Sequence, residues 1–322
     1  MKQLGRWLAS SGLRVPRPAP DWDHLATSFA RLVPEADVWR LFDRAVSGLS
    51  IALCLHRVAR TPDDVDWLSM PEQDLDLFLE RATRVRQPSS AAPWLTLAFD
   101  DGYEDACSYI ETRAQRFPSV EWLLLVCPEK VEVQAGFRWD LDGPDIPERD
   151  VRCENMRADL RAVVKAERYR LATAERCRRL AALDNAFLGN HTNCHFRTAD
   201  LAIEEASAEI RDSDIAFRRL FGEAEHFAFP FGTPEADFDE RHVNMLRERG
   251  DFLIWTTARR PYLAGHRRPG AVLPRFPVNG TWSAAQLAFW IAALSLRWRR
   301  RGLEPLYPAK LEGQFDEFLR VS

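Results

Sequence analysis

The sequence predicts an α/β fold that is built on parallel strands. Two observations carry this expectation: short apolar runs alternate with amphipathic segments of helical period, and polar residues follow several of the apolar runs. Strands separated by helices pair in parallel through crossover connections, which produces either an open sheet or a barrel. A chain of 322 residues is long enough to bury a substantial core in such a domain.

The first half of the chain is expected to supply three strands and three helices. Apolar runs whose length suits buried strands lie at 49–55, 94–99 and 120–126. Helices with one apolar face are expected at 38–46, at 71–85 and from Glu104 onwards. The segment 128–147 is rich in Gly, Pro and Asp, so we expect a loop there.

The second half continues the same alternation. Further strands are expected at 187–191, 226–229, 252–256 and 272–278, the last of them interrupted by two prolines. Further helices are expected at 159–183, 198–220 and 241–249. Thr198 is a suitable N-cap for the second of these helices, and Gly250 ends the third.

The composition is that of an ordinary globular protein. The formal net charge of −4 shows no basic excess, so we expect no nucleic-acid partner. The six cysteines are scattered without a CxxC pair, which favours reduced thiols. The first 20 residues lack a continuous apolar region, and no run of about 18 apolar residues occurs. We therefore expect neither a secretory signal nor a spanning helix, and a location in the cytoplasm.

Three parts are expected along the chain: an N-terminal extension with a helix (1–47), a main domain (48–280) and a C-terminal helical segment (281–322). The stretch 284–296 is strongly apolar, too short to span a bilayer, and followed by the basic sequence RWRRR. It is either a buried docking helix or, over 284–301, a helix that rests on a membrane surface with its arginines toward anionic lipid.

Candidate functional residues gather where the expected strands end. The residues that follow these strands are His56, Asp100, Asp101, His191, His195 and the turn Pro230-Phe231-Gly232. In barrel-like α/β folds the catalytic groups lie at the carboxyl ends of strands. We therefore expect these side chains to share one site.

The spacing of two histidines suggests a metal site. His191 and His195 are four residues apart and could face the same way on a helical turn, so that both imidazoles reach one divalent ion at about 2.0–2.1 Å. Asp101 could add a carboxylate, and such a set leaves positions open for water and substrate. A lone HxxxH also occurs by chance on surface helices. Cys194 is a weaker alternative ligand, because it should point elsewhere when the two histidines converge.

The adjacent aspartates have two interpretations. Neighbouring residues point in different directions, so one carboxylate can bind a metal while the next faces a water molecule. Asp-Asp-Gly is also a common turn sequence, in which Asp bonds nearby backbone amides. The motif taken alone does not decide between them.

Five segments, in order, resemble motifs of the polysaccharide deacetylases, the NodB-homology family. LAFDDG at 97–102 resembles the first motif, TFDDG, and HTNCH at 191–195 matches the second, H-[ST]-x-x-H. FAFPFG at 227–232 resembles the third motif of the branch that reads Tyr-Pro-Tyr-Gly. LCLHRVA at 53–59 and LPRFPV at 273–278 are similar to the YHxV strand and the closing segment found in that branch.

The resemblance implies a distorted (β/α) barrel of about seven parallel strands and the hydrolysis of N-acetyl groups on an acetylated sugar or glycan. By motif position, Asp100 is the general base. Asp101, His191 and His195 are the ligands of a divalent metal, most often zinc. The backbone N–H of Phe231, which follows the motif proline, would hold the oxyanion of the tetrahedral intermediate.

Two elements of the family are missing from the sequence. Ala228 and Phe229 stand where well-studied members carry an arginine that orients the base, and no closing Leu-x-His element supplies a general acid. His56 is the first candidate for that acid, although a histidine that only shapes the barrel mouth would look the same. His226 and His266 are weaker candidates.

Trp139, Trp255 and Pro230 are the candidate substrate contacts. Trp139 lies in a loop and could face a sugar or pack as a lid, and Trp255 resembles a family Trp that lines the acetyl pocket. Three functions stay open: a de-N-acetylase, a small-molecule amide or ester hydrolase, and a barrel that binds glycan without turnover. The retained aspartates and histidines favour an enzyme over a pure binder. A cytoplasmic member would act on a nucleotide-linked or lipid-linked sugar, or on a polymer before export.

Overall fold

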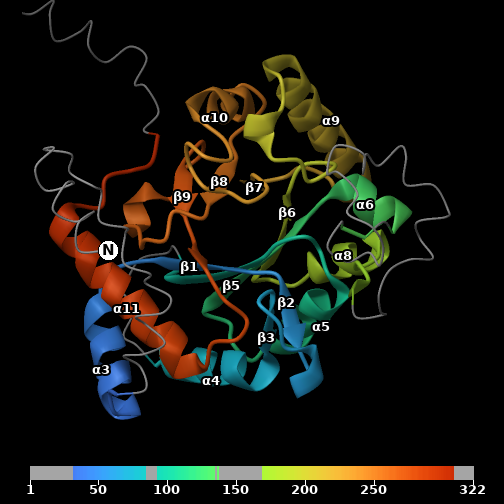
Figure 1. Ribbon diagram of the computed structural model, residues 1–322. Coiled ribbons are helices and arrows are strands. Elements are labelled where there is room, and N and C mark those ends of the chain that lie inside the picture. Colours follow the sequence, from blue (N-terminus) through green and yellow to red (C-terminus); the bar gives the residue numbers. More distant parts are fainter. Residues whose placement is uncertain (1–31, 85–92, 135, 138–168, 308–322) are drawn as a thin grey trace, which may run out of the picture.

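A sheet of parallel strands forms the centre of the molecule (Figure 1). The computed structural model describes residues 32–84, 93–134, 136–137 and 169–307. Within them, the strands pair in parallel in the order β10-β1-β4-β5-β6-β7-β8-β9. Their bounds are Ile51–Leu55 (β1), Leu95–Phe99 (β4), Val120–Val126 (β5), Ala186–Asn190 (β6), His226–Ala228 (β7), Leu253–Thr256 (β8), Val272–Pro274 (β9) and Phe276–Pro277 (β10).

The sheet closes into a barrel through its last two strands. β9 and β10 are separated only by Arg275; β9 pairs with β8, and β10 pairs with β1. Counted as one interrupted strand, they bring the number of strands to seven, and the expected (β/α) barrel is confirmed. The strands could be read as continuous apolar runs because both faces of a parallel sheet are covered.

The interior of the barrel is packed with side chains. Three alanines there leave room for larger neighbours, and the cluster consists of Ala52, Ala98, Leu123, Leu125, Ala228, Trp255, Tyr262 and Leu273. A Cβ on Gly189 would lie 2.6 Å from a Leu125 carbon and 2.9 Å from a His226 carbon, so only glycine fits at that point of β6. Because the centre is filled, room for chemistry is left at the ends of the strands.

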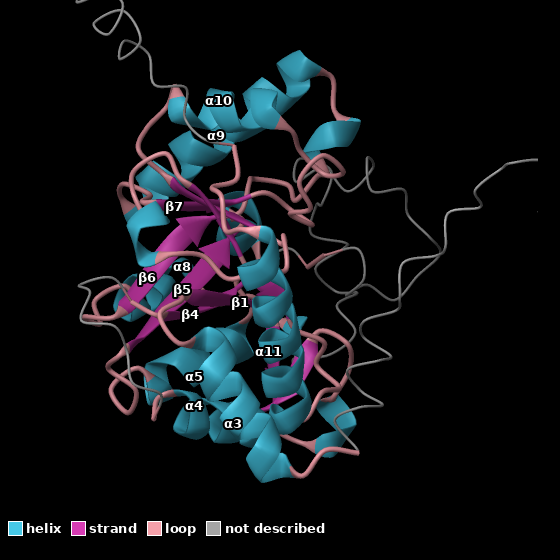
Figure 2. Ribbon diagram, turned by 90° about the vertical axis from the view of Figure 1, so that its left-hand side faces the viewer, coloured by secondary structure: helices cyan, strands magenta, loops and turns pink. Residues whose placement is uncertain are grey.

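Helices surround the barrel, as the two views in Figure 1 and Figure 2 show. Their bounds are Glu35–Val46 (α3), Glu72–Ala82 (α4), Glu104–Arg113 (α5), Pro128–Val133 (α6), Ala174–Leu180 (α8), Ile203–Phe221 (α9), Glu240–Arg247 (α10) and Ala284–Arg301 (α11). A second, two-stranded parallel sheet joins β2 (Arg57–Ala59) to β3 (Ser69–Pro71). These two strands were not expected, because three residues are too few to show a periodic pattern.

The apolar C-terminal stretch forms α11, which lies beside α3 (Figure 1). Leu287, Trp290 and Ile291 of α11 are buried, and the Arg299 guanidinium donates a hydrogen bond to the carbonyl of Ala45 (2.9 Å). The structure thus agrees with the docking interpretation of 284–296. None of the described helices is long and apolar enough to cross a membrane.

Two local expectations were wrong. The expected loop at 128–147 begins with a helix, α6, since proline is well accommodated at the first helical position, where its missing N–H needs no partner. The expected helix from Thr198 is divided into a 3-10 turn at Thr198–Asp200 and α9, which follows Ala202. Of the expected helix at 159–183, the described residues contain α8, and 159–168 lie outside them.

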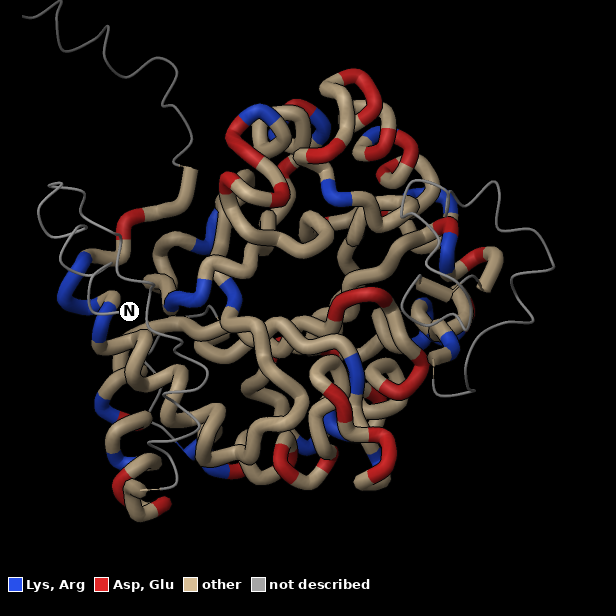
Figure 3. Tube along the Cα trace, viewed as in Figure 1, with Lys and Arg blue, Asp and Glu red and all other residues tan. Residues whose placement is uncertain are grey.

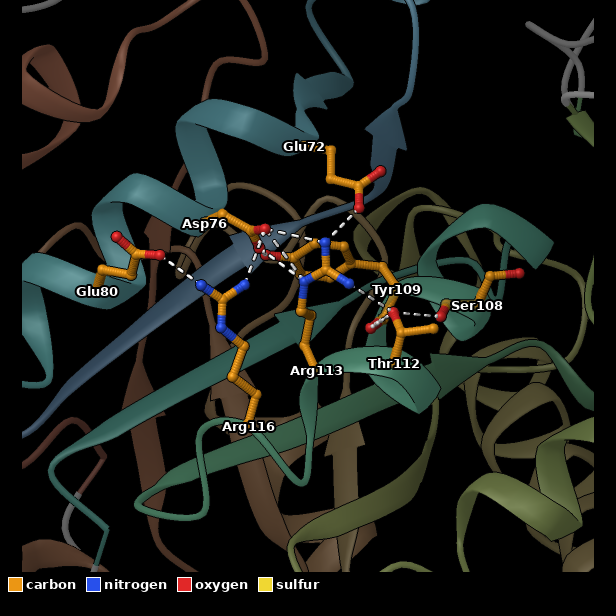
Figure 4. A network of polar contacts seen from close by, with 8 residues as sticks. All are labelled: Glu72, Asp76, Glu80, Ser108, Tyr109, Thr112, Arg113 and Arg116. Atoms are coloured by element: carbon orange, nitrogen blue, oxygen red, sulfur yellow. Dashed lines mark hydrogen bonds and ion pairs between the residues drawn. The ribbon is translucent and has the colours of Figure 1, made fainter.

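Lys and Arg are interspersed with Asp and Glu over the outer helices (Figure 3). One charged network ties α4 to α5 (Figure 4). Asp76 accepts hydrogen bonds from Tyr109 (2.7 Å) and Arg113 (2.9 Å), and Glu80 pairs with Arg116. This network stabilises the contact of two helices and contains none of the candidate site residues.

Candidate metal centre

The structure brings the predicted metal ligands together. Asp101 follows β4, and His191 and His195 follow β6. The Oδ1 atom of Asp101 lies 3.2 Å from Nε2 of His195 and 3.7 Å from Nε2 of His191. Two ligands that are each about 2.0–2.1 Å from one tetrahedral ion are separated by about 3.3 Å. The three side chains therefore stand at distances that suit a shared cation, and all three are buried.

The protonation of these groups also fits a cation. Asp101 is completely buried, and neither of its carboxylate oxygens has a hydrogen-bond donor within the described residues. Burial raises the pKa of Asp101 and lowers that of His191, and it lowers the pKa of His195 to about 3. Both imidazoles are therefore neutral near pH 7, as metal ligands must be.

A backbone contact orients the first histidine. Nδ1 of His191 lies 2.9 Å from the carbonyl oxygen of Ala228. If Nδ1 carries the proton and donates it there, the lone pair of Nε2 is left to face Asp101. This is the arrangement by which proteins usually fix the tautomer of a ligating histidine.

The two histidines converge on a loop, and the helical turn expected from their spacing was wrong. Thr192 and His195 have φ of 62° and 64°, in the left-handed region that non-glycine residues rarely adopt. The carboxylate of Glu209 on α9 accepts hydrogen bonds from the amides of Asn193 (2.9 Å) and Cys194 (2.7 Å). Glu209, which the sequence did not reveal, thus holds the strained loop in place.

Asp100 has a different environment from its neighbour. Its carboxylate accepts two hydrogen bonds from the guanidinium of Arg275, at 2.5 and 3.0 Å, and one from the Cys54 thiol, at 3.4 Å. Burial by itself would raise the pKa of Asp100, but the charge and hydrogen bonds of Arg275 outweigh it and hold that pKa well below its usual range. Oδ2 of Asp100 lies 3.8 Å from Nε2 of His191, so an ionised carboxylate stands beside the ligand set.

Arg275 supplies the guanidinium that the third motif lacks. Ala228 and Phe229 are fully buried and apolar at that position, whereas Arg275 reaches Asp100 from the junction of β9 and β10. The contact spans 175 residues of sequence. The segment LPRFPV was visible in the sequence, but the partner of its arginine was not.

Of the three candidate acids, His56 lies at the site. A ring nitrogen of His56, the Cys54 sulfur and an Asp100 oxygen lie within 4.8 Å of one another. Burial lowers the pKa of His56, against the opposing effect of the two aspartates. His226 lies inside the barrel, where its Nδ1 accepts a hydrogen bond from the Trp255 indole (3.1 Å). His266 lines a separate cavity of about 240 Å³, together with Arg247 and Tyr307.

The remaining predicted residues differ in their access to the site. The Phe231 ring lies 5.3 Å from that of His195, and Phe231 has a left-handed φ of 63°. Pro230 is buried in the same turn. Trp255 is fully buried and packs on His226 and Tyr262. Trp139 lies outside the described residues.

No model of a protein family matches the sequence, and no curated protein matches it significantly. Several solved structures resemble the fold. A polysaccharide deacetylase from Bacillus cereus has a TM-score of 0.51 at 12% identity, over 75% of this chain and 68% of that one. The Streptococcus pyogenes deacetylase PplD, in complex with acetate, has a TM-score of 0.51 at 13% identity, over 74% and 96%. IcaB from Ammonifex degensii reaches 0.49 at 18% identity, over 76% and 97%. The barrel fold is therefore one that polysaccharide deacetylases have.

Proposed function

We propose that this protein is a metal-dependent hydrolase that removes N-acetyl groups from a sugar or glycan. One observation carries the proposal: the buried Asp101 carboxylate has no hydrogen-bond donor among the described residues and faces two neutral imidazoles beside an ionised Asp100. The motif order of the sequence and the fold of the deacetylases from Bacillus cereus and Streptococcus pyogenes support it.

Asp101, His191 and His195 would hold the metal. Two imidazoles and one carboxylate suit zinc best among common divalent ions, and three protein ligands leave a position for substrate or water. When bound, the ion supplies Lewis acidity to the acetyl carbonyl and to a water molecule.

The reaction needs three further groups from the chain. Asp100 accepts the proton of the attacking water, and Arg275 keeps that carboxylate ionised and oriented. The backbone N–H of Phe231 stabilises the oxyanion that forms when water oxygen bonds to the acetyl carbon. As the carbon–nitrogen bond breaks, His56, which its lowered pKa leaves neutral, takes up the proton that Asp100 has accepted and passes it to the sugar nitrogen, which releases acetate and the amine.

Other groups would shape the substrate site. We propose Pro230 and Trp139 as contacts of the sugar, and we propose that Trp255 lies beneath the acetyl pocket. We also propose a reducing compartment such as the cytoplasm, supported by the buried free thiols of Cys54, Cys107, Cys127 and Cys177. Peripheral contact of 284–301 with anionic lipid is a further proposal, supported by the exposed Arg300 and Arg301.

The test measures bound metal and acetate release together. Elemental analysis should find about one zinc or similar ion per chain, and wild-type protein should release acetate from at least one member of a panel of N-acetylated and O-acetylated sugars. Asp100→Asn should abolish release but keep the metal, and His191→Ala should lose both. His266→Gln, in the separate cavity, is the matched control and should change neither.

Three results would count against the proposal. A metal-free protein in which His191→Ala changes nothing would refute a metal-dependent hydrolase. Binding of sugars without release of acetate would indicate a glycan-binding barrel. Release from small esters or amides but from no sugar would favour the small-molecule hydrolase. Acetate release that survives Asp100→Asn would refute the role of Asp100 alone.

A further inference from the structure

Two aromatic side chains are exposed among the described residues, and both contact candidate site histidines. Trp67 is 65% exposed, and Phe231 is 38% exposed. The Trp67 ring lies 6.5 Å from the ring of His56, and the Phe231 ring lies 5.3 Å from that of His195. Exposed apolar surface concentrated at one place marks a binding site more often than scattered exposure does.

The loop that carries Trp67 is held firmly although the indole faces solvent. The Trp67 carbonyl accepts a hydrogen bond from the Gly280 amide (2.9 Å), and the next carbonyl, of Leu68, accepts one from the Arg57 amide (3.1 Å). The carboxylate of Asp66 accepts a hydrogen bond from the Leu68 amide (2.9 Å). The exposed ring is thus presented by a backbone that is fixed on both sides.

Gly280 shows how closely this loop is packed. A Cβ on Gly280 would lie 2.2 Å from the Asp66 carbonyl oxygen and 2.6 Å from backbone atoms of Ser69. Only glycine permits that approach, and the approach places the loop at its fixed distance from the end of β10. A ring that is preorganised in this way loses little conformational freedom when a ligand covers it.

Of the two rings, Trp67 is the better platform. The Arg197 guanidinium lies over the Phe231 ring, 4.9 Å from its centre, so one face of that ring is already covered. The flat, apolar face of an indole complements the C–H face of a pyranose, while the hydroxyl groups of the sugar stay in water. A polar ligand with one apolar face explains why so large a ring remains exposed beside a polar site.

We propose that Trp67 is a stacking platform for the sugar unit next to the one that is deacetylated. The proposal rests on the proposed function and makes it more specific: the substrate class is an oligosaccharide or polymer of at least two units. His56 lies between the platform and Asp100, so the stacked unit would extend away from the metal site along the β2–β3 side of the mouth.

The experiment compares long and short acetyl donors. The probes are N-acetylglucosamine, its β-1,4- and β-1,6-linked tetramers, and ethyl acetate, which is too small to reach Trp67. Trp67→Ala should raise KM for the preferred tetramer about tenfold or more, while kcat changes little. It should leave the rates with ethyl acetate unchanged. Trp67→Phe, which keeps a ring, should recover most of the loss.

Leu263→Ala is the matched control, because Leu263 is exposed (41%) but lies outside the candidate site. It should behave as wild type. Equal losses on the tetramer and on ethyl acetate after Trp67→Ala would show a structural role and overturn the platform. An unchanged KM of Trp67→Ala for both tetramers would also overturn the platform, and it would leave the proposed deacetylase activity unaffected.

A binding measurement separates the platform from the enzyme activity. If wild-type protein releases acetate from no probe, the proposed function fails. Calorimetric titration with the tetramers then still tests whether Trp67 is a sugar-binding platform. Binding to wild-type protein that is weakened about tenfold or more by Trp67→Ala would support the platform. If the tetramers do not bind wild-type protein, or bind wild-type protein and Trp67→Ala equally well, the platform is overturned.

Discussion

Replacing Asp101 by Asn should have opposite effects on the stability of the metal-free and the metal-loaded protein. In the metal-free state, the Asp101 carboxylate is completely buried with no donor in the described part of the chain, and it must either stay charged there or take up a proton. Each unit by which burial raises its pKa corresponds to about 1.4 kcal/mol. We expect the neutral amide to stabilise the metal-free protein by about 1–3 kcal/mol.

The metal-loaded protein should show the reverse order. An ion at 100 times its Kd stabilises the native state by about 2.7 kcal/mol. Since 1 kcal/mol shifts Tm by about 2–4 °C in domains of 150–250 residues, zinc should raise the wild-type Tm by about 5–10 °C. Asp101→Asn removes the anionic ligand and should lose most of that rise.

The assay is thermal unfolding followed by circular dichroism, after treatment with a chelator and again after addition of zinc. The exposed Asp251→Asn is the control for removing a carboxylate, and it should stay within about 0.5 kcal/mol of wild type in both states. If Asp101→Asn melted below wild type in both states by the same amount, its carboxylate would be a structural group, and the assignment of the metal centre would be refuted.

Three further predictions follow from named contacts. Arg275→Lys keeps the charge but loses the two-pronged hydrogen bonding to Asp100, so kcat should fall about tenfold or more with KM and metal content unchanged; normal kcat would contradict the role of Arg275. Glu209→Gln weakens the hydrogen bonds that fix the loop of His191 and His195, so the Kd for zinc, measured by competition with a metal-binding dye, should rise about 10–100-fold. An unchanged Kd would mean that the loop keeps its conformation without the Glu209 carboxylate. Asp76→Asn should lower the free energy of unfolding in urea by about 1 kcal/mol at neutral pH. Burial raises the pKa of Asp76, but its hydrogen bonds with Arg113 and Tyr109 prevail and lower it, so this stabilisation is present above pH 3.8 and is lost as pH falls through the lowered pKa. A deficit that persisted at low pH would contradict the electrostatic explanation.

The sequence was most informative where burial covers both faces of an element. β1, β4 and β5 are mostly apolar with every residue buried, and their ends were predicted to within two residues. The same logic pointed to the candidate ligand residues, because Asp101 lies two residues after β4 and His191 directly follows β6. Such patterns are local, and a local pattern can be read without knowing what an element packs against.

The sequence was least informative where function depends on distant contacts. Arg275 meets Asp100 across 175 residues, and Glu209 fixes a loop that lies 15 residues before it. Neither contact leaves a periodic signal. The left-handed backbone of Thr192 and His195 also could not be inferred from an HxxxH spacing, which a helix would satisfy with less strain.

The position of Arg275 links the closure of the barrel to the ionisation of Asp100, the proposed base. Its amide donates a hydrogen bond to the carbonyl of Thr256 on β8, while the next residue, Phe276, pairs with Leu53 on β1. The side chain therefore stands where the last strand passes from one neighbour to the other, and from there it reaches Asp100 at the end of β4. A guanidinium on another strand, such as at the third motif, would need a different path to the same carboxylate. The proposed chemistry requires a fixed cation beside Asp100, and here the strand pairing that completes the barrel supplies it.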